Sequence, residues 1–448
     1  MRTIVEPKRY IDNLWGKQQI KEDDTYRMMR YVLRVDHDGK VLLHNAVTGQ
    51  LAVLSQVEAD ILDRLPATYA PVMEALACDH YLVPEDYDEH QQVVNLRTIL
   101  RKLEESQQSK SINKYTILPT TACNARCYYC FEQGVKITKM TEREADDVVK
   151  FITLHSDINE IIHITWFGGE PTVAADRIDQ ISMGLQENNV RFYSDMTSNG
   201  YLFDEQMVHR AKSLWNLEYI QICFDGLEAK HNEIKNYSNA NDNPFERTLR
   251  NVGLLLDQGI RVGMRMNFDL SNYQDFDGLI NEAIKRFGNN PALSIYAFPV
   301  IGEYKNRAGK IIHGSNDWFI SRIPEMNGIS RERGTYHERH ILPHLEYHCC
   351  DAENKRAITI TPDGSLVRCC QCVGKEQSVG TIWDGISYDS EIYKSWNQYA
   401  DYPKCKECAY YPYCCRLNNC SAQDRCLFKV EWGKRNRKTI IDTYIRRA

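Results

Sequence analysis

The chain has 448 residues, with 55 Lys and Arg against 61 Asp and Glu, and this length predicts two or three domains. A content of 43% hydrophobic and 26% charged residues is typical of globular proteins and excludes a disordered or collagen-like chain. The net charge of −6 gives no overall basic field for nucleic acid, and no signal peptide or long uncharged apolar run is recognised. We therefore expect a cytoplasmic protein that binds neither nucleic acid nor a membrane.

Residues 1–110 alternate short strands and helices. Strands are expected at Tyr31 to Val35, Val41 to His44 and Leu51 to Leu54, joined by the turn signals Asp38-Gly39 and Thr48-Gly49. Ser55 is the expected N-cap of a helix starting at Gln56, and a longer amphipathic helix is expected from about Asp86 to Glu104. Three strands followed by helices indicate a small winged-helix-like module.

Residues 111–335 show a different pattern, in which strand-like runs alternate with amphipathic segments of helix length. The six expected strands are Tyr115–Leu118, Ile161–Phe167, Val190–Thr197, Tyr219–Phe224, Val262–Phe268 and Leu293–Pro299. The five expected helices are Glu142–His155, Asp176–Glu187, Asp204–Leu214, Phe245–Gln258 and Tyr273–Phe287. This alternation indicates parallel βαβ units and an α/β fold, either an open doubly wound sheet or part of a barrel.

Residues 336–448 hold most of the cysteines, since 11 of the 16 lie in the last 100 residues. In a cytosolic chain of this size, such a density indicates metal or cluster ligation more often than disulfides. Periodic structure is sparse from about Ser315 onward. We therefore expect a region organised by ligands and not by a large apolar core.

The first strand of the α/β region is followed directly by Cys123, Cys127 and Cys130, in a C-x3-C-x2-C spacing on a loop. A structural zinc site takes four ligands, whereas three Cys on a cubane 4Fe-4S cluster leave one iron free for a small molecule. The loop lies at the C-terminal end of a strand, where active sites of βα barrels are built. An open cluster site is therefore expected, with zinc and a distant fourth ligand as the alternative.

The next three strands each end in a turn with functional potential. Gly168, Gly169 and Glu170 follow the second strand; glycines let a backbone approach a ligand closely, and a carboxylate beside them can neutralise an ammonium group. Ser198 and Asn199 close the third strand, and Cys223-Phe224-Asp225-Gly226 closes the fourth. Each segment has an alternative interpretation as a turn alone.

Cys123, Cys127 and Cys130 resemble the cluster motif of radical S-adenosylmethionine (AdoMet) enzymes. The resemblance implies a partial (β/α)6 TIM-like barrel over residues 111–335. It also implies that the open iron of a 4Fe-4S cluster binds the amino and carboxylate groups of AdoMet, and that reductive cleavage releases a 5′-deoxyadenosyl radical that abstracts a hydrogen atom. Tyr129 then packs near the adenine, and Gly168, Gly169, Glu170, Ser198 and Asn199 bind the cofactor or line the substrate cavity.

Two residues in this region need separate mention. Cys223 stands where serine is common in the family, so a small buried hydrophobic side chain is expected there. Arg265 is a charge inside an otherwise apolar strand and needs a partner if it is buried. It is a candidate for binding the carboxylate or ribose of the cofactor, with a structural salt bridge as the alternative.

The late cysteines resemble the SPASM domain, an extension of radical AdoMet enzymes that modify peptides and proteins, which binds two auxiliary 4Fe-4S clusters. The resemblance assigns Cys350, Cys369 and Cys420 to the first cluster, with Cys349 or Cys372 as a further ligand, and Cys405, Cys408, Cys414 and Cys426 to the second. The usual C-x5-C-x3-C spacing would place a cysteine at position 418, which is Asn418 here. The choice between Cys414 and Cys415 therefore stays open, and surplus thiols such as Cys370 have an alternative as inert core residues.

The resemblance as a whole implies a peptide maturase with three 4Fe-4S clusters. It would take a hydrogen atom from a ribosomally made precursor peptide and install a crosslink, either a thioether or a carbon–carbon or carbon–oxygen bond. Residues 1–110 resemble the peptide-recognition element of such maturases, whose strand edge can pair with a leader segment. A flavodoxin or ferredoxin is the expected electron donor.

Two alternatives are kept. One is oxidation of Cys or Ser to formylglycine, as in sulfatase-maturing relatives; there an aspartate follows the cysteine after the Asp-Gly turn, whereas Cys370 follows Cys369 here. The other is a zinc-binding adaptor that recruits a peptide, since C-x2-C is equally a zinc signature.

Overall fold

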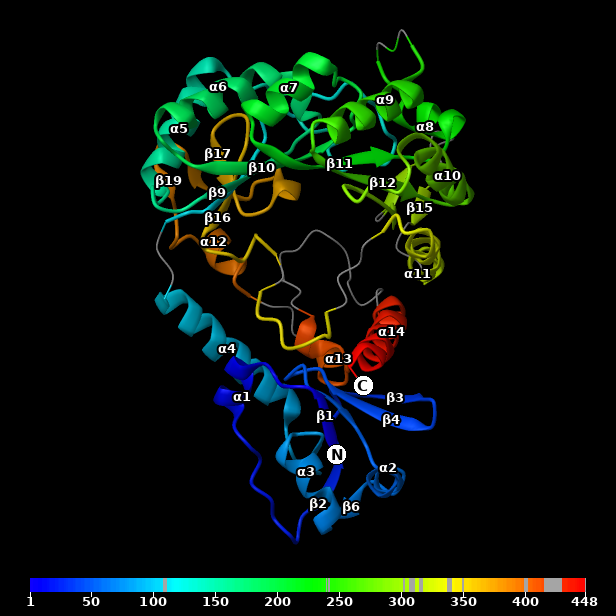
Figure 1. Ribbon diagram of the computed structural model, residues 1–448. Coiled ribbons are helices and arrows are strands. Elements are labelled where there is room, and N and C mark those ends of the chain that lie inside the picture. The colour runs from blue at the N-terminus through cyan, green and yellow to red at the C-terminus, as the bar shows by residue number, and fades with distance from the viewer. Residues whose placement is uncertain are drawn as a thin grey trace.

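The computed structural model describes residues 1–107, 111–238, 240, 242–300, 303–305, 311–313, 317–336, 341–348, 350–398, 402–414 and 429–447. An upper lobe is built on one long sheet with helices along one side, and the first hundred residues form a lower lobe (Figure 1). Within the described residues, no helix combines the length and the apolar composition needed to cross a membrane.

The centre of the upper lobe is a run of six parallel strands that lie side by side in chain order. They are β8 (Lys114–Ile117), β9 (Ile162–Trp166), β10 (Phe192–Ser198), β11 (Leu217–Phe224), β12 (Arg261–Phe268) and β13 (Leu293–Pro299). This confirms the predicted α/β fold, and because the strand order never reverses, the doubly wound alternative is excluded. That the six strands curve into a partial barrel stays a prediction.

Helices cover one face of these strands (Figure 1). They are α5 (Glu142–His155), α6 (Ala175–Glu187), α7 (Glu205–Ser213), α8 (Glu228–Lys235), α9 (Pro244–Asp257) and α10 (Phe276–Phe287). Their starts follow the expected capping chemistry, since the side chains of Thr141, Asp204 and Asn243 each accept a backbone hydrogen bond from the first turn. The sequence missed α8 because its buried face carries His231 and Lys235 and so has no apolar period.

The two faces of the sheet differ in chemistry. On β12, Val262, Met264, Met266 and Phe268 point into the core beneath the helices, and the neighbouring strands alternate in the same way. The intervening positions are half-buried and largely polar, among them Thr165, Asp195, Gln221 and Arg265. Parallel sheets are normally apolar on both faces, so the polar face is the side on which a site is expected.

The C-terminal third adds four short strands to the same sheet beyond β8, in the order β16 (Ala357–Ile360), β17 (Ser365–Val367), β18 (Ser378–Thr381) and β19 (Gly385–Ile386). Strand β16 runs parallel to β8, and the others are antiparallel. Among the described residues the remaining elements here are β14 (Glu303–Lys305), β15 (Ile311–His313), α11 (Asp317–Glu332), α12 (Glu391–Ser395), α13 (Pro403–Lys406) and α14 (Lys429–Arg447). Regular structure is sparser here than in the α/β region, as expected, but the two long helices α11 and α14 were not predicted. Helix α11 contains Pro324, and the described buried side chains of α14 are Asn436, Thr439 and Ile440, so neither shows an apolar period.

The lower lobe contains two small sheets. The strands β1 (Arg2–Val5), β5 (Leu51–Val53), β4 (Lys40–Asn45) and β3 (Val32–His37) form one, and β6 (Ala67–Thr68), β2 (Thr25–Met28) and β7 (Leu82–Pro84) form the other. The helices are α1 (Arg9–Trp15), α2 (Gln56–Leu62), α3 (Glu74–Cys78) and α4 (Glu89–Gln107). The predicted strands are β3, β4 and β5, and Ser55 caps α2 in a capping box with Glu58. Strands of two to four residues are too short to show a period, so the second sheet was missed; the winged-helix-like character of the module stays a prediction.

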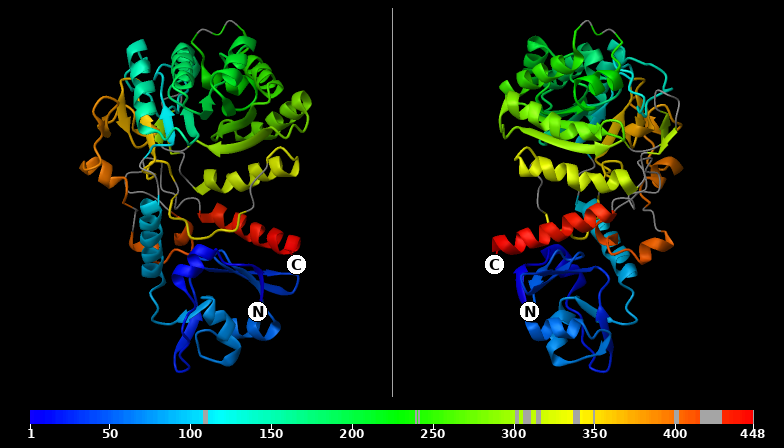
Figure 2. Two further views of the ribbon diagram at one scale, coloured as in Figure 1. Left: turned by 60° about the vertical axis from the view of Figure 1, so that its left-hand side comes forward. Right: turned by 90° about the vertical axis from the view of Figure 1, so that its right-hand side faces the viewer.

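The last helix connects the lobes. Helix α14 contacts both β3 of the lower lobe and α11 of the upper lobe, and it lies between them in both views of Figure 2. A second connection is Arg97 on α4, whose buried guanidinium donates to the carbonyl oxygens of Glu346 (3.0 Å), Tyr411 (2.5 Å), Pro412 (2.9 Å) and Cys414 (3.1 Å). The late cysteine segment is therefore held directly by the N-terminal module.

His44 on β4 gives the lower lobe a pH dependence that can be measured. Burial, with a smaller contribution from His344, lowers its pKa to about 3, so the folded state requires the neutral ring. Stability from this group is fully present above the unfolded pKa of about 6.5 and is lost as pH falls below it, by about 1.4 kcal/mol at pH 5.5. Urea denaturation gives the free energy of unfolding of wild type and His44→Gln at pH 7.5 and 5.5. The decrease in this free energy between the two pH values should be smaller in the variant by about 1.4 kcal/mol. Equal decreases in the two proteins would contradict the assignment.

Candidate functional site

The three early cysteines lie on the loop that follows β8. Cys123 and Cys127 are half-buried and Cys130 is exposed. Burial is the main cause that raises the pKa of the Cys123 thiol to about 11 and that of the Cys127 thiol to about 12, and the neighbouring carboxylates and cysteines contribute less to both. Three adjacent thiols from one loop are the donor set that an open 4Fe-4S cluster uses. In the described part of the chain, no three His, Cys, Asp or Glu side chains are arranged to hold a single metal ion.

The Gly-Gly-Glu segment after β9 packs against this loop. A Cβ at Gly168, whose φ is +118°, would lie 2.3 Å from the carbonyl oxygen of Thr120, and one at Gly169 would lie 2.5 Å from that of Thr121 and 2.4 Å from that of Ala122. The amide of Gly169 donates to the Thr120 oxygen (3.2 Å), and that of Glu170 donates to the Ala122 oxygen (2.9 Å). The close approach that requires glycine is therefore made by the backbone of the cysteine loop.

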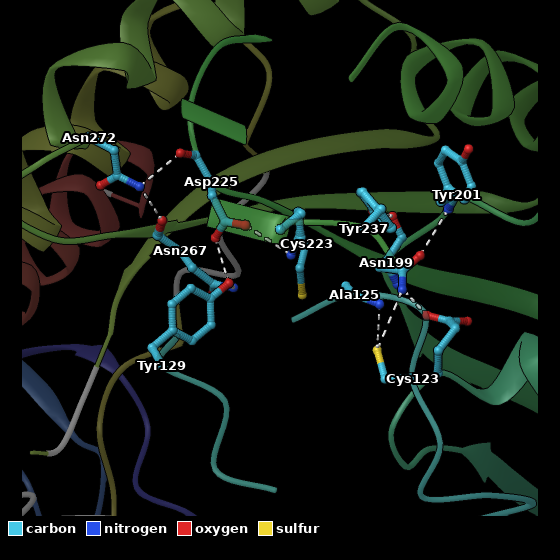
Figure 3. Close-up of polar contacts among 12 residues, drawn as sticks. Cys123, Ala125, Tyr129, Asn199, Tyr201, Cys223, Asp225, Tyr237, Asn267 and Asn272 are labelled. Carbon is cyan, nitrogen blue, oxygen red and sulfur yellow. Dashed lines mark hydrogen bonds and ion pairs between the residues drawn. The ribbon is translucent and has the colours of Figure 1, made fainter. Parts of the chain in front are cut away.

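Glu170 joins the ends of β9 and β10. Its buried carboxylate accepts hydrogen bonds from the amide (3.1 Å) and hydroxyl (2.6 Å) of Thr172, the hydroxyl of Ser198 (2.8 Å) and the amide of Asn199 (2.7 Å). The Asn199 side chain in turn donates to Oδ1 of Asn124 (2.7 Å) and lies 3.9 Å from Sγ of Cys123 (Figure 3). The predicted site residues at the ends of β9 and β10 thus form one hydrogen-bonded unit with Cys123, which follows β8.

A buried ion pair holds the other end of the loop. Tyr129 donates to Oδ1 of Asp225 (2.5 Å) and accepts from the side chain of Asn267 (3.0 Å) (Figure 3). Asp225 also pairs with Nζ of Lys235 at 3.0 Å, and both side chains are almost fully excluded from solvent. Burial opposes the charge on Lys235, but the Asp225 carboxylate, together with Tyr129, Cys127 and Cys223, outweighs it and holds the Lys235 pKa well above its usual value.

Lys235 was not recognised from the sequence, and Asp225 was named only as part of the turn that closes the fourth strand. The sequence signal that could have revealed the pair is a Lys at the end of a short helix that begins just after the Asp225-Gly226 turn. A Lys is seldom buried unless an acidic side chain pairs with it, so the nearby Asp is the natural partner. The amide of Arg126 donates to the Lys235 carbonyl at 2.7 Å, so the end of α8 touches the cysteine loop directly. That Tyr129 contacts an adenine stays a prediction.

Arg265 lies on the polar face of β12, with its guanidinium carbon 4.4 Å from the centre of the Phe298 ring. The structural salt bridge that the sequence left open is absent from the described residues. Cys223, on the adjacent strand, is half-buried and not fully buried as expected for a small core residue. Polar surroundings on this face of β11 explain the difference.

The structure brings part of the first late cysteine group together. Cys350, Cys369 and Cys372 pack with Ala352 and Trp396 in a small cluster. The Cys369 thiol hydrogen-bonds with the side chains of Cys370 and Cys372, which lowers the Cys369 pKa. Cys372 is therefore placed beside the predicted ligands, whereas Cys349 and Cys420 lie outside the described residues.

The second late group starts on α13. Cys405 and Cys408 pack against the core of the N-terminal module, and the Cys414 carbonyl accepts the hydrogen bond from Arg97. Cys426 of the same predicted set and Cys415, the alternative to Cys414, lie outside the described residues. Among the described cysteines, the two late groups therefore occupy different surroundings, as two separate sites require.

Comparisons with known proteins agree with this geometry. Residues 117–283 match the Radical SAM superfamily. Among solved structures, the chain is similar to anSMEcpe with bound AdoMet and Kp18Cys peptide, at TM-score 0.57 and 16% identity over 74% of this chain and 99% of the other. It is also similar to SuiB of Streptococcus suis bound to S-adenosylmethionine, at TM-score 0.50 and 14% identity over 87% of this chain and 94% of the other. At these identities the likeness concerns the fold.

A curated relative is Fe-coproporphyrin III synthase of Methanosarcina barkeri, which is 26% identical over 171 residues. The match covers 37% of this chain and 41% of that protein. The chain thus spans less than half of the length of this relative.

Proposed function

We propose that the protein is a radical AdoMet peptide maturase, which removes a hydrogen atom from a ribosomally made precursor peptide and installs an intramolecular crosslink. The observation that carries the proposal is the three-thiol loop, held by the Gly-Gly-Glu segment at the C-terminal ends of parallel strands. The fold shared with anSMEcpe, a protein solved with AdoMet and a peptide, supports peptide as the substrate class.

Cys123, Cys127 and Cys130 would hold the catalytic cluster, and Tyr129, Gly168, Gly169, Glu170, Ser198 and Asn199 are the proposed AdoMet contacts. When bound, the cluster supplies the electron that cleaves AdoMet and generates the hydrogen-abstracting radical. The chain's own residues fix the loop: Glu170 aligns Asn199 with Cys123, and Asp225 fixes the hydroxyl of Tyr129. Such placement confines a reactive species to one orientation.

The late cysteines are proposed to hold two auxiliary 4Fe-4S clusters in a SPASM domain over residues 336–448. Cys350, Cys369 and Cys372 are near one another, and Cys405, Cys408 and Cys414 form the described part of the second set. With Cys420 and Cys426 as further ligands, the holoprotein would contain about a dozen irons. An iron-loaded protein of this kind contradicts the zinc-adaptor alternative.

The N-terminal module, residues 1–110, is proposed to bind the leader segment of the precursor through a strand edge, and a flavodoxin or ferredoxin to supply electrons. Strands β1 and β3 are the two edges of its larger sheet, and α14 contacts β3. Since Arg97 of this module holds the late cysteine segment, deletion of the whole module would disturb the late cysteine segment as well as peptide recognition. Point variants are therefore the better test of recognition.

Crosslinking is preferred to formylglycine formation because Cys370 occupies the position of the aspartate base. The two reactions differ in product mass. A crosslink that keeps all heavy atoms loses two hydrogens, whereas formylglycine formed from cysteine loses the sulfur.

Replacing Cys127 with Ala tests the proposed function directly. We expect 5′-deoxyadenosine formation from AdoMet and dithionite to fall to background, with a loss of about four irons per chain, because the loop has no spare thiol. Cys78→Ala is the matched control, since Cys78 ends α3 in the lower lobe. Chromatography with mass detection measures deoxyadenosine, and its persistence in Cys127→Ala would refute the assignment.

A further inference from the structure

The polar face of the sheet carries a cation without a counter-charge. Nε of Arg265 is buried and has no hydrogen-bond partner, and the residues that the structure describes provide no ion pair to this guanidinium. The neighbouring Phe298 ring supports its flat face at 4.4 Å but supplies no acceptor. Since a half-buried guanidinium whose Nε has lost its contact with water still needs an acceptor, the arrangement indicates an anionic ligand.

The polar side chains beside Arg265 have hydrogen-bond partners among themselves. Cys223 on β11, Arg265 on β12 and Tyr296 on β13 are register partners, so they form one row across the sheet. The Tyr296 hydroxyl donates to Oε1 of Gln221 at 2.6 Å. Burial raises the pKa of Tyr296 well above its usual value, which keeps this hydroxyl neutral. The row therefore offers hydrogen-bonding groups but no negative charge.

The row lies close to the cysteine loop. Asn267, two positions further along β12, donates to the hydroxyl of Tyr129 at 3.0 Å. Two residues of a strand span about 6.6 Å, which places the Arg265 backbone one step from the residue that touches the loop. Figure 3 shows the sulfur atom of Cys223, the register partner of Arg265, pointing into the space between Tyr129 and Cys123.

We propose that Arg265 binds a carboxylate of the peptide substrate, supplied by an Asp or Glu side chain near the atom that loses hydrogen. This inference rests on the proposed function and makes Arg265 a specificity-determining residue. A carboxylate can accept two parallel hydrogen bonds from the guanidinium fork, which a neutral amide cannot match. The proposed AdoMet contacts come from the loop and from β9 and β10, whereas the Arg265 row spans β11 to β13, so the substrate is favoured over the cofactor as the source of the carboxylate.

Two acetylated, amidated pentapeptides, Ala-Ala-Glu-Ala-Ala and Ala-Ala-Gln-Ala-Ala, are suitable probes. Their affinity for the anaerobic, iron-loaded full chain with S-adenosylhomocysteine bound can be measured by titration calorimetry. We expect wild type to bind the Glu peptide about tenfold more tightly than the Gln peptide, and Arg265→Gln to bind both equally. Arg261→Gln is the matched control, because Arg261 is an exposed residue of the same strand and should leave the preference intact.

Cofactor affinity and iron content separate the outcomes. Unchanged AdoMet affinity in Arg265→Gln supports the peptide site, whereas lost AdoMet affinity with retained peptide preference would transfer Arg265 to the cofactor and overturn the proposal. Absence of any preference in wild type would overturn it as well. If Arg265→Gln loses iron, Arg265→Lys keeps the charge and should retain a reduced preference for Glu; equal binding in a folded, iron-loaded Arg265→Lys would again overturn it. If wild type forms deoxyadenosine but shows no preference for the carboxylate, the proposed function stands and only the role of Arg265 is refuted. If wild type forms no deoxyadenosine, the proposed function itself is refuted.

Discussion

Gly169→Ala is expected to reduce deoxyadenosine formation at least about 100-fold, because the added methyl has no space against the cysteine loop. Its Cβ would lie 2.4 Å from the Ala122 oxygen, 2.5 Å from the Thr121 oxygen and 2.7 Å from the Ala122 carbonyl carbon. All three atoms belong to the backbone, so no side chain can rotate away. The loop that presents Cys123 must move, and displacements of about an ångström at a catalytic centre cost this much activity.

The effect should be specific to the site. Gly253→Ala is the control, since a Cβ at Gly253 in α9 would meet only Cε1 of Phe287 at 3.4 Å, and alanine is the better helix former by about 1 kcal/mol. We expect the control to keep full activity and equal or higher stability. Iron content and deoxyadenosine yield are measured on both variants after identical anaerobic reconstitution, and an active Gly169→Ala protein would show that the tight contact between the two segments is dispensable.

The sequence predicts the α/β region well because its helices are amphipathic and its strands are regular. Helix α5 has the expected bounds, and β13 does as well. Local chemistry specifies such elements: Thr141 caps α5 in a capping box with Glu144, and its apolar residues repeat on one face. The positions of the cysteine and Gly-Gly-Glu motifs at strand ends follow from the same alternation.

The missed features depend on contacts between distant parts of the chain. Strand β16 joins the sheet beside β8, which precedes it by about 240 residues, and no local pattern predicts that pairing. The partnership of Asp225 with Lys235 and Tyr129 is a second case, because each residue taken alone is compatible with a turn or a surface position. The role of Gly169 was predicted only in part. The sequence correctly indicated a close approach of the backbone at this glycine, but in the structure the approaching group is the backbone of the cysteine loop and not a ligand.

Lys235→Met should destabilise the upper lobe by about 3–5 kcal/mol, the usual cost of removing one partner of a buried ion pair. Asp225 would keep its hydrogen bond from Tyr129 but lose the charge that compensates its burial. Burial already raises the pKa of Asp225, and loss of Lys235 raises it further, so the carboxyl of the variant binds a proton more readily when folded. The loss of stability is therefore largest at pH 8 and shrinks as pH falls towards 5.

A double variant shows whether the ion pair, and not packing, is responsible. In Lys235→Met with Asp225→Asn no charge is buried, so we expect the free energy of unfolding to recover most of the loss. Lys230→Met is the control on the same helix, where a half-exposed pair with Glu233 at 3.2 Å should contribute less than about 1 kcal/mol. Urea denaturation followed by circular dichroism gives these values for all three proteins. The Lys235 carbonyl, which accepts the hydrogen bond from the Arg126 amide, is retained in every variant. If the double variant regains both stability and deoxyadenosine formation, the ion pair acts as a stabilising support of the cysteine loop. If it regains stability alone, the charge of Lys235 has a separate part in the reaction.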